Sequence, residues 1–246
     1  MEIYTLTDIG RVRHSNQDAV DGGIIKDNIM WAVLCDGMGG ANGGNVASET
    51  AVQTVKENIG FFDPKASEYQ SEIFLTGIVE KANSTIYHKQ RKDESLTGMG
   101  TTMELVIAVD GRAMIAHVGD SRTYLIQNNR VIQITVDHSV VQELVNRGEI
   151  TAEQAKVHPN KNYITRAVGV HPYIESDYIE IPFGHNDVLI LCSDGLSNYI
   201  SDECMLNSVQ NYSGEQLAQR LVDLANEYGG RDNISVAVLY ANKNRE

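Results

Sequence analysis

Aspartates stand at the ends of four apolar, strand-like segments, each in a turn that contains glycine. Asp36 follows Trp31–Cys35, Asp120 follows His117–Gly119, Asp194 follows Leu191–Ser193, and Asp232 comes just before Ile234. One such aspartate is an ordinary turn residue, because Asp-Gly is a common turn dipeptide. Four of them, together with Asp18 in Asn16-Gln17-Asp18, favour a shared role. A carboxylate at the mouth of a buried strand is costly unless it is paired, hydrogen-bonded or metal-bound.

The binding of hard divalent cations is the chemistry that these carboxylates suit. Mg²⁺ and Mn²⁺ prefer oxygen ligands and retain bound waters. His117 and His138 are interpreted as structural residues rather than as ligands. The residues alone therefore predict an oxygen-lined site for hard divalent cations, and such sites most often handle phosphate groups.

Buried strands and hairpins must position these aspartates. Asp110-Gly111 and Asn128-Asn129 are two-residue hairpin signals. The apolar runs that predict buried strands are Ile29–Cys35, Glu104–Val109, Ala113–Val118, Val188–Ser193 and Ile234–Tyr240. Because residues adjacent in a strand face opposite sides, Cys35 is expected to point away from Asp36.

Helical spacing appears in three longer segments. One runs through Ala47 to Ile59, a second through Phe74 to Ile86, and a third covers Gly214–Tyr228 and ends at Gly229-Gly230. The order of elements is not a regular strand–helix alternation, so antiparallel sheets covered by helices are expected. Between two strands, residues 139–162 are predicted to form a helical insertion, and such loops often border active sites.

Composition and charge exclude several functions. The chain has 246 residues and a formal charge of −13, which argues against a nucleic-acid partner because such a partner requires a basic surface. No apolar run approaches the roughly 18 residues of a membrane span, and the first residues lack the features of a signal peptide. Three cysteines without CxxC spacing argue against a disulfide framework and against a thiolate zinc site. A cytoplasmic protein without membrane contact is expected.

Short motifs spread over nearly the whole chain carry a family resemblance. They are Asp8-Ile9-Gly10 with Arg13, Asn16-Gln17-Asp18, Asp36-Gly37-Met38-Gly39-Gly40, Gly98-Met99-Gly100-Thr101-Thr102, Gly119-Asp120-Ser121-Arg122, Asp137-His138-Ser139, His158-Pro159, Thr165-Arg166-Ala167, Ser193-Asp194-Gly195 and Gly230-Arg231-Asp232-Asn233. In this order they resemble the protein phosphatase 2C family of metal-dependent serine/threonine protein phosphatases, in its bacterial form. The resemblance implies an α+β fold, a four-layer α-β-β-α sandwich with two central antiparallel sheets flanked by helices. It also implies a single phosphatase domain over residues 1–246.

The resemblance also assigns a role to each acidic residue. Asp36 is expected to bridge two core ions, Mn²⁺ or Mg²⁺, with the Gly37 carbonyl on the second ion. Asp194 and Asp232 are expected on the first ion, and Asp18 reaches the pair through water. Asp120, with Asp194, corresponds to the position of a third ion.

The implied reaction is hydrolysis of phosphoserine and phosphothreonine in proteins by a metal-bridging hydroxide. Arg13 is expected to bind the phosphate, and residues 139–162 to form a mobile flap beside the site. The implied partners are phosphorylated proteins, which would be substrates of a cognate Ser/Thr kinase, and the chain is expected to be a monomer. Met38 and Ala41 occupy positions where relatives often carry a histidine, so the sequence names no general acid.

Two other functions are compatible with the same motifs. One is a phosphoesterase of the same fold that acts on another phosphorylated residue or on a small phosphoester. The other is a catalytically inactive module that binds phosphoproteins. Inactive relatives usually lose metal ligands, whereas all five aspartates are present here, which disfavours the second alternative.

Overall fold

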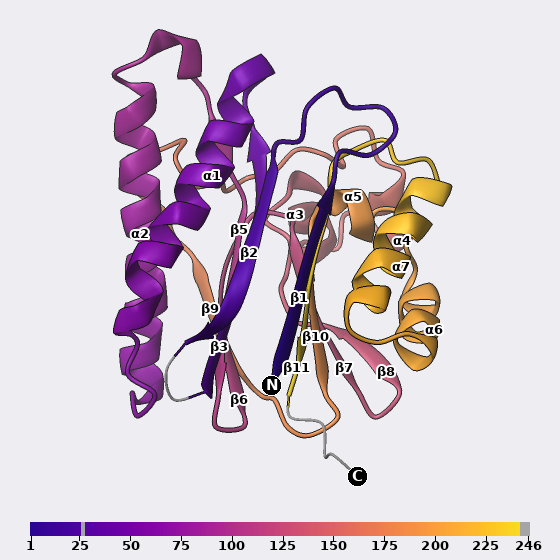
Figure 1. Ribbon diagram of the computed structural model, residues 1–246. Coiled ribbons are helices and arrows are strands. Elements are labelled where there is room, and N and C mark those ends of the chain that lie inside the picture. The colour runs from indigo at the N-terminus through magenta and orange to yellow at the C-terminus, as the bar shows by residue number, and fades with distance from the viewer. Residues whose placement is uncertain (26–27, 242–246) are drawn as a thin grey trace.

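Two antiparallel sheets pack face to face and carry helices on their outer faces (Figure 1). This is a computed structural model that describes residues 1–25 and 28–241, without the side chains of residues 40–42. The expected α-β-β-α sandwich is therefore confirmed. The side chain of Ala41, one of the two positions noted above, lies outside the described part.

The first sheet contains both ends of the described chain. Its strand order is β1-β11-β10-β7-β8, so the first strand pairs with the last. The bounds are β1 (Glu2–Asp8), β7 (Arg122–Gln127), β8 (Arg130–Gln133), β10 (Val188–Cys192) and β11 (Ile234–Tyr240). The predicted strands at Val188–Ser193 and Ile234–Tyr240 are confirmed within one residue.

The second sheet has the order β2-β3-β5-β6-β9, with the short β4 paired to β3. The bounds are β2 (Asp18–Ile25), β3 (Ile29–Met38), β4 (Gly100–Thr101), β5 (Met103–Val109), β6 (Arg112–Val118) and β9 (Asp177–Pro182). The three predicted strands of this sheet are confirmed, and β3 continues past Cys35 through Asp36 to Met38.

Both predicted hairpin turns are present. Asp110 and Gly111 have φ values of 51° and 81°, and Asn128 and Asn129 have values of 51° and 58°. Positive φ at both central residues matches the right-handed twist of the flanking strands. These turns fix the registers of β5 with β6 and of β7 with β8.

Two long helices cover the second sheet, and three shorter ones cover the first (Figure 1). The bounds are α1 (Gly40–Asn58), α2 (Glu68–Gln90), α5 (Asp194–Ser197), α6 (Asp202–Asn211) and α7 (Glu215–Glu227), with short 3₁₀ turns at Ile59–Phe61 and Glu94–Leu96. Helix α2 begins at a capping box formed by Ser67 and Gln70. Helix α7 ends before Gly229 and Gly230, both at positive φ, as its sequence predicted.

The alternation of side chains along β3 places Asp36 between the sheets. Ile29, Trp31, Val33 and Cys35 pack toward α1 and α2. Met30, Ala32 and Leu34 pack between the two sheets. Asp36 continues this second series, so the prediction that Cys35 points away from it is confirmed.

The insertion at residues 139–162 is helical, as predicted. It contains α3 (Val140–Asn146), capped by Ser139, and α4 (Ala152–Lys156), capped by Thr151. Its two ends meet, because Ser139 and Ile164 form an isolated β-bridge and the Val140 amide donates to the Tyr163 carbonyl at 2.9 Å. This helical segment is called the flap below.

Two further expectations concern membranes and cysteines. Among residues 1–25 and 28–241, no helix is long and apolar enough to cross a membrane. Cys35 and Cys192 are buried, Cys204 is half-buried, and all three are free thiols.

Candidate active site

Strand pairing brings Asp18 and Asp36 side by side. Asp18 opens β2 and lies opposite Asp36 in the antiparallel pair of β2 with β3. Asp18 also accepts a hydrogen bond from the Ser193 hydroxyl at 2.8 Å. Since Ser193 follows β10 in the other sheet, this bond connects the ends of the two sheets at the two carboxylates.

The backbone of Asp36 is fixed by the threonines after Gly100. The Asp36 amide donates to Thr102 Oγ1 at 2.8 Å, and the Asp36 carbonyl accepts from the Thr102 amide at 2.9 Å. Thr102 Oγ1 lies 2.8 Å from Ser121 Oγ in the turn that carries Asp120. The motif at residues 98–102 thus couples Asp36 to Asp120.

Gly37 occupies a position that no larger residue could take. Its amide donates to the Gln17 carbonyl at 3.1 Å. A Cβ atom at Gly37 would lie 2.2 Å from the Gly44 carbonyl oxygen and 2.4 Å from that of Gln17. Such contacts with backbone cannot be relieved by a side-chain rotation, so glycine keeps the strand after Asp36 close to both segments.

Asn233 holds the loop between β1 and β2 against the end of the first sheet. Its amide group donates to the carbonyls of Ile9 and Ser15, each at 3.0 Å, and its Oδ1 accepts from the Gln17 amide at 2.8 Å. This loop carries Arg13, whose guanidinium donates to Asp232 Oδ2 at 2.7 Å. Arg13 therefore lies next to the aspartates although it is 219 positions away from Asp232 in the sequence.

Asp194 and Asp120 complete the group. Asp194 is the first residue of α5 and accepts from Asn198 Nδ2 at 3.1 Å. Asp120 follows Gly119, which has φ of 111°, in the turn from β6 to β7. The structure thus gathers every sequence-predicted site residue, Arg13 and Gly37 included, at one end of the sandwich.

The electrostatics of the group show that the aspartates share one environment. Burial, followed by repulsion from Asp18 and then the other three aspartates, raises the pKa of Asp36 well above its usual range. Burial also raises the pKa of Asp18 to about 7; the hydrogen bonds from Ser235 and Ser193 oppose this shift, and repulsion from Asp194 and Asp232 adds a smaller contribution to it.

The two remaining buried carboxylates respond in the same way. The pKa of Asp120 is raised to about 7 by burial and then by Asp194, and that of Asp194 to about 6 by burial and then by Asp232. Arg122 opposes both shifts but does not cancel them. The group carries more negative charge than the surrounding cations neutralise.

This donor set fits divalent cations. All the side-chain donors are carboxylate oxygens, which Mg²⁺ and Mn²⁺ prefer, and a cation would offset the repulsion that raises their pKa values. Within the described residues, no three Asp, Glu, His or Cys side chains stand together as a ready-made ligand group. Arg13, Ser193 and Asn198 each contact one of the carboxylates.

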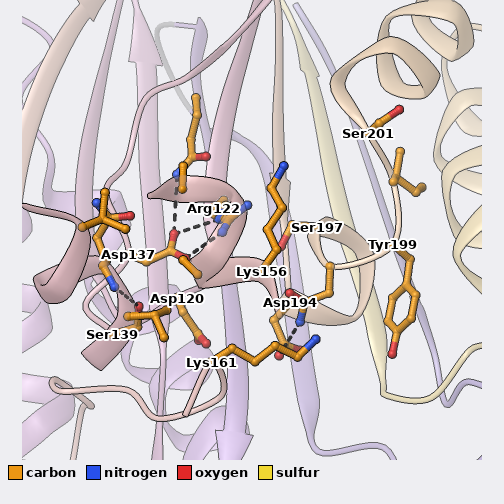
Figure 2. Close-up of a pocket in the computed structure, with 18 residues that line it drawn as sticks. Asp120, Arg122, Asp137, Ser139, Lys156, Lys161, Asp194, Ser197, Tyr199 and Ser201 are labelled. Carbon is orange, nitrogen blue, oxygen red and sulfur yellow. Dashed lines mark hydrogen bonds and ion pairs between the residues drawn. The ribbon is translucent and has the colours of Figure 1, made fainter. Parts of the chain in front are cut away.

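A cleft opens beside the aspartates, between the flap and α5. Its volume is about 430 Å³. Asp120 and Asp194 line it, and Figure 2 shows them on opposite sides of the space. The cleft therefore leads from the carboxylates to the flap.

Sequence reasoning identified the charged residues but gave no role to the polar residues that position them. These are Thr102, Ser121, Ser193, Asn198 and Asn233. Most of them stand inside the motifs that carried the family resemblance, directly beside an aspartate or a glycine. That adjacency was the available signal.

Comparisons with known proteins agree with this geometry. Residues 11–235 match the model of the family described as Protein phosphatase 2C. The serine/threonine phosphatase stp of Listeria welshimeri is 40% identical over 241 residues, covering 96% of this chain and 94% of that protein.

Solved structures show the same similarity. The serine/threonine phosphatase of S. agalactiae superposes with a TM-score of 0.91 at 36% identity, covering 98% of this chain and 99% of that one. The catalytic domain of the serine/threonine protein phosphatase PstP, solved with two manganese ions, has a TM-score of 0.85 at 33% identity, with 96% of each chain covered.

Proposed function

Since this chain belongs to the protein phosphatase 2C family, we propose that its five gathered aspartates hold the divalent cations with which it removes phosphate from protein serine and threonine residues. The serine/threonine phosphatases to which it is similar match it over nearly their whole length. The chain is accordingly a protein serine/threonine phosphatase. The observation that carries the proposed site is the buried, under-neutralised carboxylate group at the end of the sandwich.

The residues would divide the cations between them. Asp36 would contact both core ions, with the Gly37 carbonyl on the second ion. Asp194 and Asp232 would bind the first ion, while Asp18, which already accepts from Ser193, would act through water. Asp120, whose pKa is raised by burial and then more by Asp194 than by Asp137, would hold a third ion together with Asp194.

Bound cations at this place would lower the pKa of a water molecule so that hydroxide is available near neutral pH, and would neutralise charge on the phosphate. The two sheet ends hold Asp18 and Asp36 in fixed register, so the protein pays little reorganisation when the ions enter. The hydrogen bonds to Thr102 keep the Asp36 backbone from shifting during turnover.

Arg13 is placed to hold the phosphate. Its side chain is 52% exposed, and Asp232 engages one terminal nitrogen. A guanidinium has five N–H donors in a planar fork that matches phosphate geometry. Arg13 can therefore contact Asp232 and two phosphate oxygens together, which orients the phosphorus toward the aspartates.

The remaining features of the proposal concern the context of the chain. We propose that residues 1–246 act as a single phosphatase domain, with residues 139–162 as its flap. The expected substrates are phosphorylated proteins that a cognate Ser/Thr kinase modifies, and the enzyme is expected to act as a monomer in the cytoplasm.

Phosphate release from phosphoserine and phosphothreonine peptides tests the proposal. After metal stripping with EDTA, hydrolysis should be lost, and Mn²⁺ or Mg²⁺ should restore it. A phosphotyrosine peptide of the same sequence serves as the matched substrate control and should be hydrolysed poorly. Full activity in EDTA after stripping would contradict a role for the aspartates in holding cations.

A further inference from the structure

The cleft between the flap and α5 has charges that the reaction described above does not use. Its walls come from the flap on one side and from α5 with the loop after it on the other. The lining includes Lys156, Lys161, Ser197, Asn198, Tyr199 and Ser201. Figure 2 shows the side chains of Lys156 and Lys161 among those that line this space.

Among the described residues Lys156 and Lys161 make no close ion pair, although Lys156 lies near enough to Glu153 on α4 to help the hydrogen bonds of that carboxyl lower its pKa. Both are exposed, and within residues 1–25 and 28–241 neither has a carboxylate within ion-pairing distance (4.0 Å). The third cation of the cleft, Arg122, is engaged: its Nε and NH2 donate to the two oxygens of Asp137 at 2.8 and 2.7 Å. Two lysines facing one cleft are conspicuous in a chain of net charge −13.

The charge balance of the cleft changes when cations bind. Asp120 and Asp194 would then be neutralised by the ions they hold, and Asp137 is already paired with Arg122. The cations of the cleft that then have no carboxylate within ion-pairing distance, in the part of the chain that the structure describes, are Lys156 and Lys161, with only the exposed Glu153 acting on Lys156 from a greater distance. A cleft of this volume lies within the roughly 300–1,000 Å³ of ordinary ligand sites, and its walls offer apolar surface at Val141 and Val145.

We propose that this cleft binds the substrate residues next to the phosphorylated one, and that Lys156 and Lys161 select substrates with an anionic side chain there. The anion is a carboxylate of Asp or Glu, or a second phosphorylated residue. This inference rests on the proposed function, because it takes the phosphorylated residue to lie at the aspartates. Asp120 and Asp194 line both regions, so a peptide whose phosphate reaches the aspartates extends into the cleft.

Three phosphothreonine peptides of one sequence test the selection. Their flanking positions carry glutamine, glutamate or phosphoserine, and the measurement is kcat/KM for release of the phosphothreonine phosphate in Mn²⁺ at low salt. Each exposed lysine–anion pair contributes a factor of about 1.4 to 5. We expect the two anionic peptides to be preferred over the glutamine peptide by about three- to tenfold, mainly through KM, and the preference to shrink at high salt.

The variant Lys156→Gln/Lys161→Gln should lose most of that preference. The matched control is Lys65→Gln/Lys92→Gln, which changes the net charge equally at two exposed lysines on either side of α2, and it should keep the preference. The ratio between peptides is the readout, so a general change in catalysis cancels.

Each other outcome contradicts the inference in a distinct way. No preference in the wild type, or a preference kept by the cleft variant, overturns it while the proposed function stands. Equal loss in the control variant would assign the effect to net charge rather than to the cleft. Failure to hydrolyse any of the three peptides in Mn²⁺ would overturn the proposed function itself, and the inference with it.

Discussion

Two groups of buried ionisable side chains lie between the sheets, and they differ in how their charge is balanced. Glu104 and His117 are fully buried and contact each other through Oε1 and Nδ1. The other Glu104 oxygen accepts from Thr123 Oγ1 at 2.5 Å, and His117 Nε2 donates to the Val136 carbonyl at 3.0 Å. The hydrogen-bonding groups of the pair are therefore satisfied by the protein alone, although burial still raises the pKa of Glu104 against the opposing effect of His117.

The aspartate group lies at the end of the same layer, with Asp18 buried and the other four half-buried, and it lacks such a balance. His117 is only three residues from Asp120, and Thr102, which fixes Asp36, is two residues from Glu104. Burial first, and then repulsion between the carboxylates, nevertheless raises the pKa values of Asp36 and Asp120. The comparison teaches that a buried charge paired within the chain holds the fold together, whereas one left without a partner marks the place where a cation is required.

Asp36→Asn should show the largest difference between the aspartate group and the Glu104–His117 pair, because it should affect activity and not stability. We expect kcat toward a phosphopeptide to fall at least about 100-fold, because a core ligand is lost. In EDTA the free energy of unfolding should not decrease, since the substitution removes a charge that its neighbours repel. Urea unfolding and steady-state kinetics measure both effects, and Asp21→Asn on the same strand β2 as Asp18 is the control. An equal loss of stability in EDTA would mean that Asp36 is structural.

Glu104→Gln should show the reverse pattern. Removing one partner of a buried pair leaves the other without compensation, and we expect a loss of about 2–3 kcal/mol in the free energy of unfolding. The kcat of the folded protein should fall far less than in Asp36→Asn. His117→Gln on this background should cost much less than it does alone, because the two residues act as a pair. Additive losses in urea unfolding would contradict the pairing.

Asp120→Ala should distinguish the site of the third ion from the sites of the two core ions. If Asp120 serves a third ion only, kcat should fall on the order of tenfold while the core pair remains bound. Counting bound Mn²⁺ by calorimetry in the variant and the wild type tests this expectation. Loss of all bound ions in the variant would show that Asp120 is not a separate site.

Arg13→Ala should reveal how far the chain itself supplies positive charge to the group. Arg13 is half-exposed, so its contribution is screened, and we expect KM for the phosphopeptide to rise by a factor of about five. Arg13→Lys should recover only part of this, because an ammonium cannot reproduce the guanidinium fork. An unchanged KM in Arg13→Ala would leave Arg13 as a surface residue paired with Asp232.

Much of the sandwich could be predicted from local patterns, and the failures have physical causes. The strands β3, β10 and β11 are continuous apolar runs and were identified. The strand β2 was not, because Asp21, Gly22 and Gly23 are poor strand formers, and its pairing with β3 outweighs that preference. The four-residue helix α5 is too short to show a period.

The sequence predicted which residues belong to the site, but it did not predict the hydrogen bonds between them. The hydrogen bond that fixes Asp36 joins residues 66 positions apart, and the bond from Ser193 to Asp18 joins residues 175 apart. No local pattern encodes such pairs. The Glu104–His117 pair was accessible, however, because the Asp110-Gly111 turn sets the register that places these two residues opposite each other.

The response of stability to pH offers the smallest and finest test of the comparison. Burial alone would lower the pKa of His117, but the charge of Glu104 and its hydrogen bond outweigh burial and raise it. A group whose pKa is higher in the folded protein stabilises the fold fully below its unfolded pKa, about 6.5 for histidine. That stabilisation is lost as the pH rises through the folded pKa. The free energy of unfolding should therefore decline as the pH rises above about 6.5.

The groups that face His117 determine the design of the measurement. The ring of His138 lies 4.5 Å away between centroids, but burial first, and then the charges of His117 and Arg166, lower its pKa to about 4, so it stays neutral across this range. Asp18 and Asp120, with pKa values of about 7, titrate within it.

The measurement is therefore the difference between wild type and Glu104→Gln, in which the contribution of the aspartates cancels because both proteins carry it. The decline should be present in the wild type and absent from the variant, where His117 has lost the charge that raised its pKa. A decline of equal size in both proteins would assign the loss of stability to the aspartates. It would also contradict the expectation that the charge of Glu104 raises the pKa of His117.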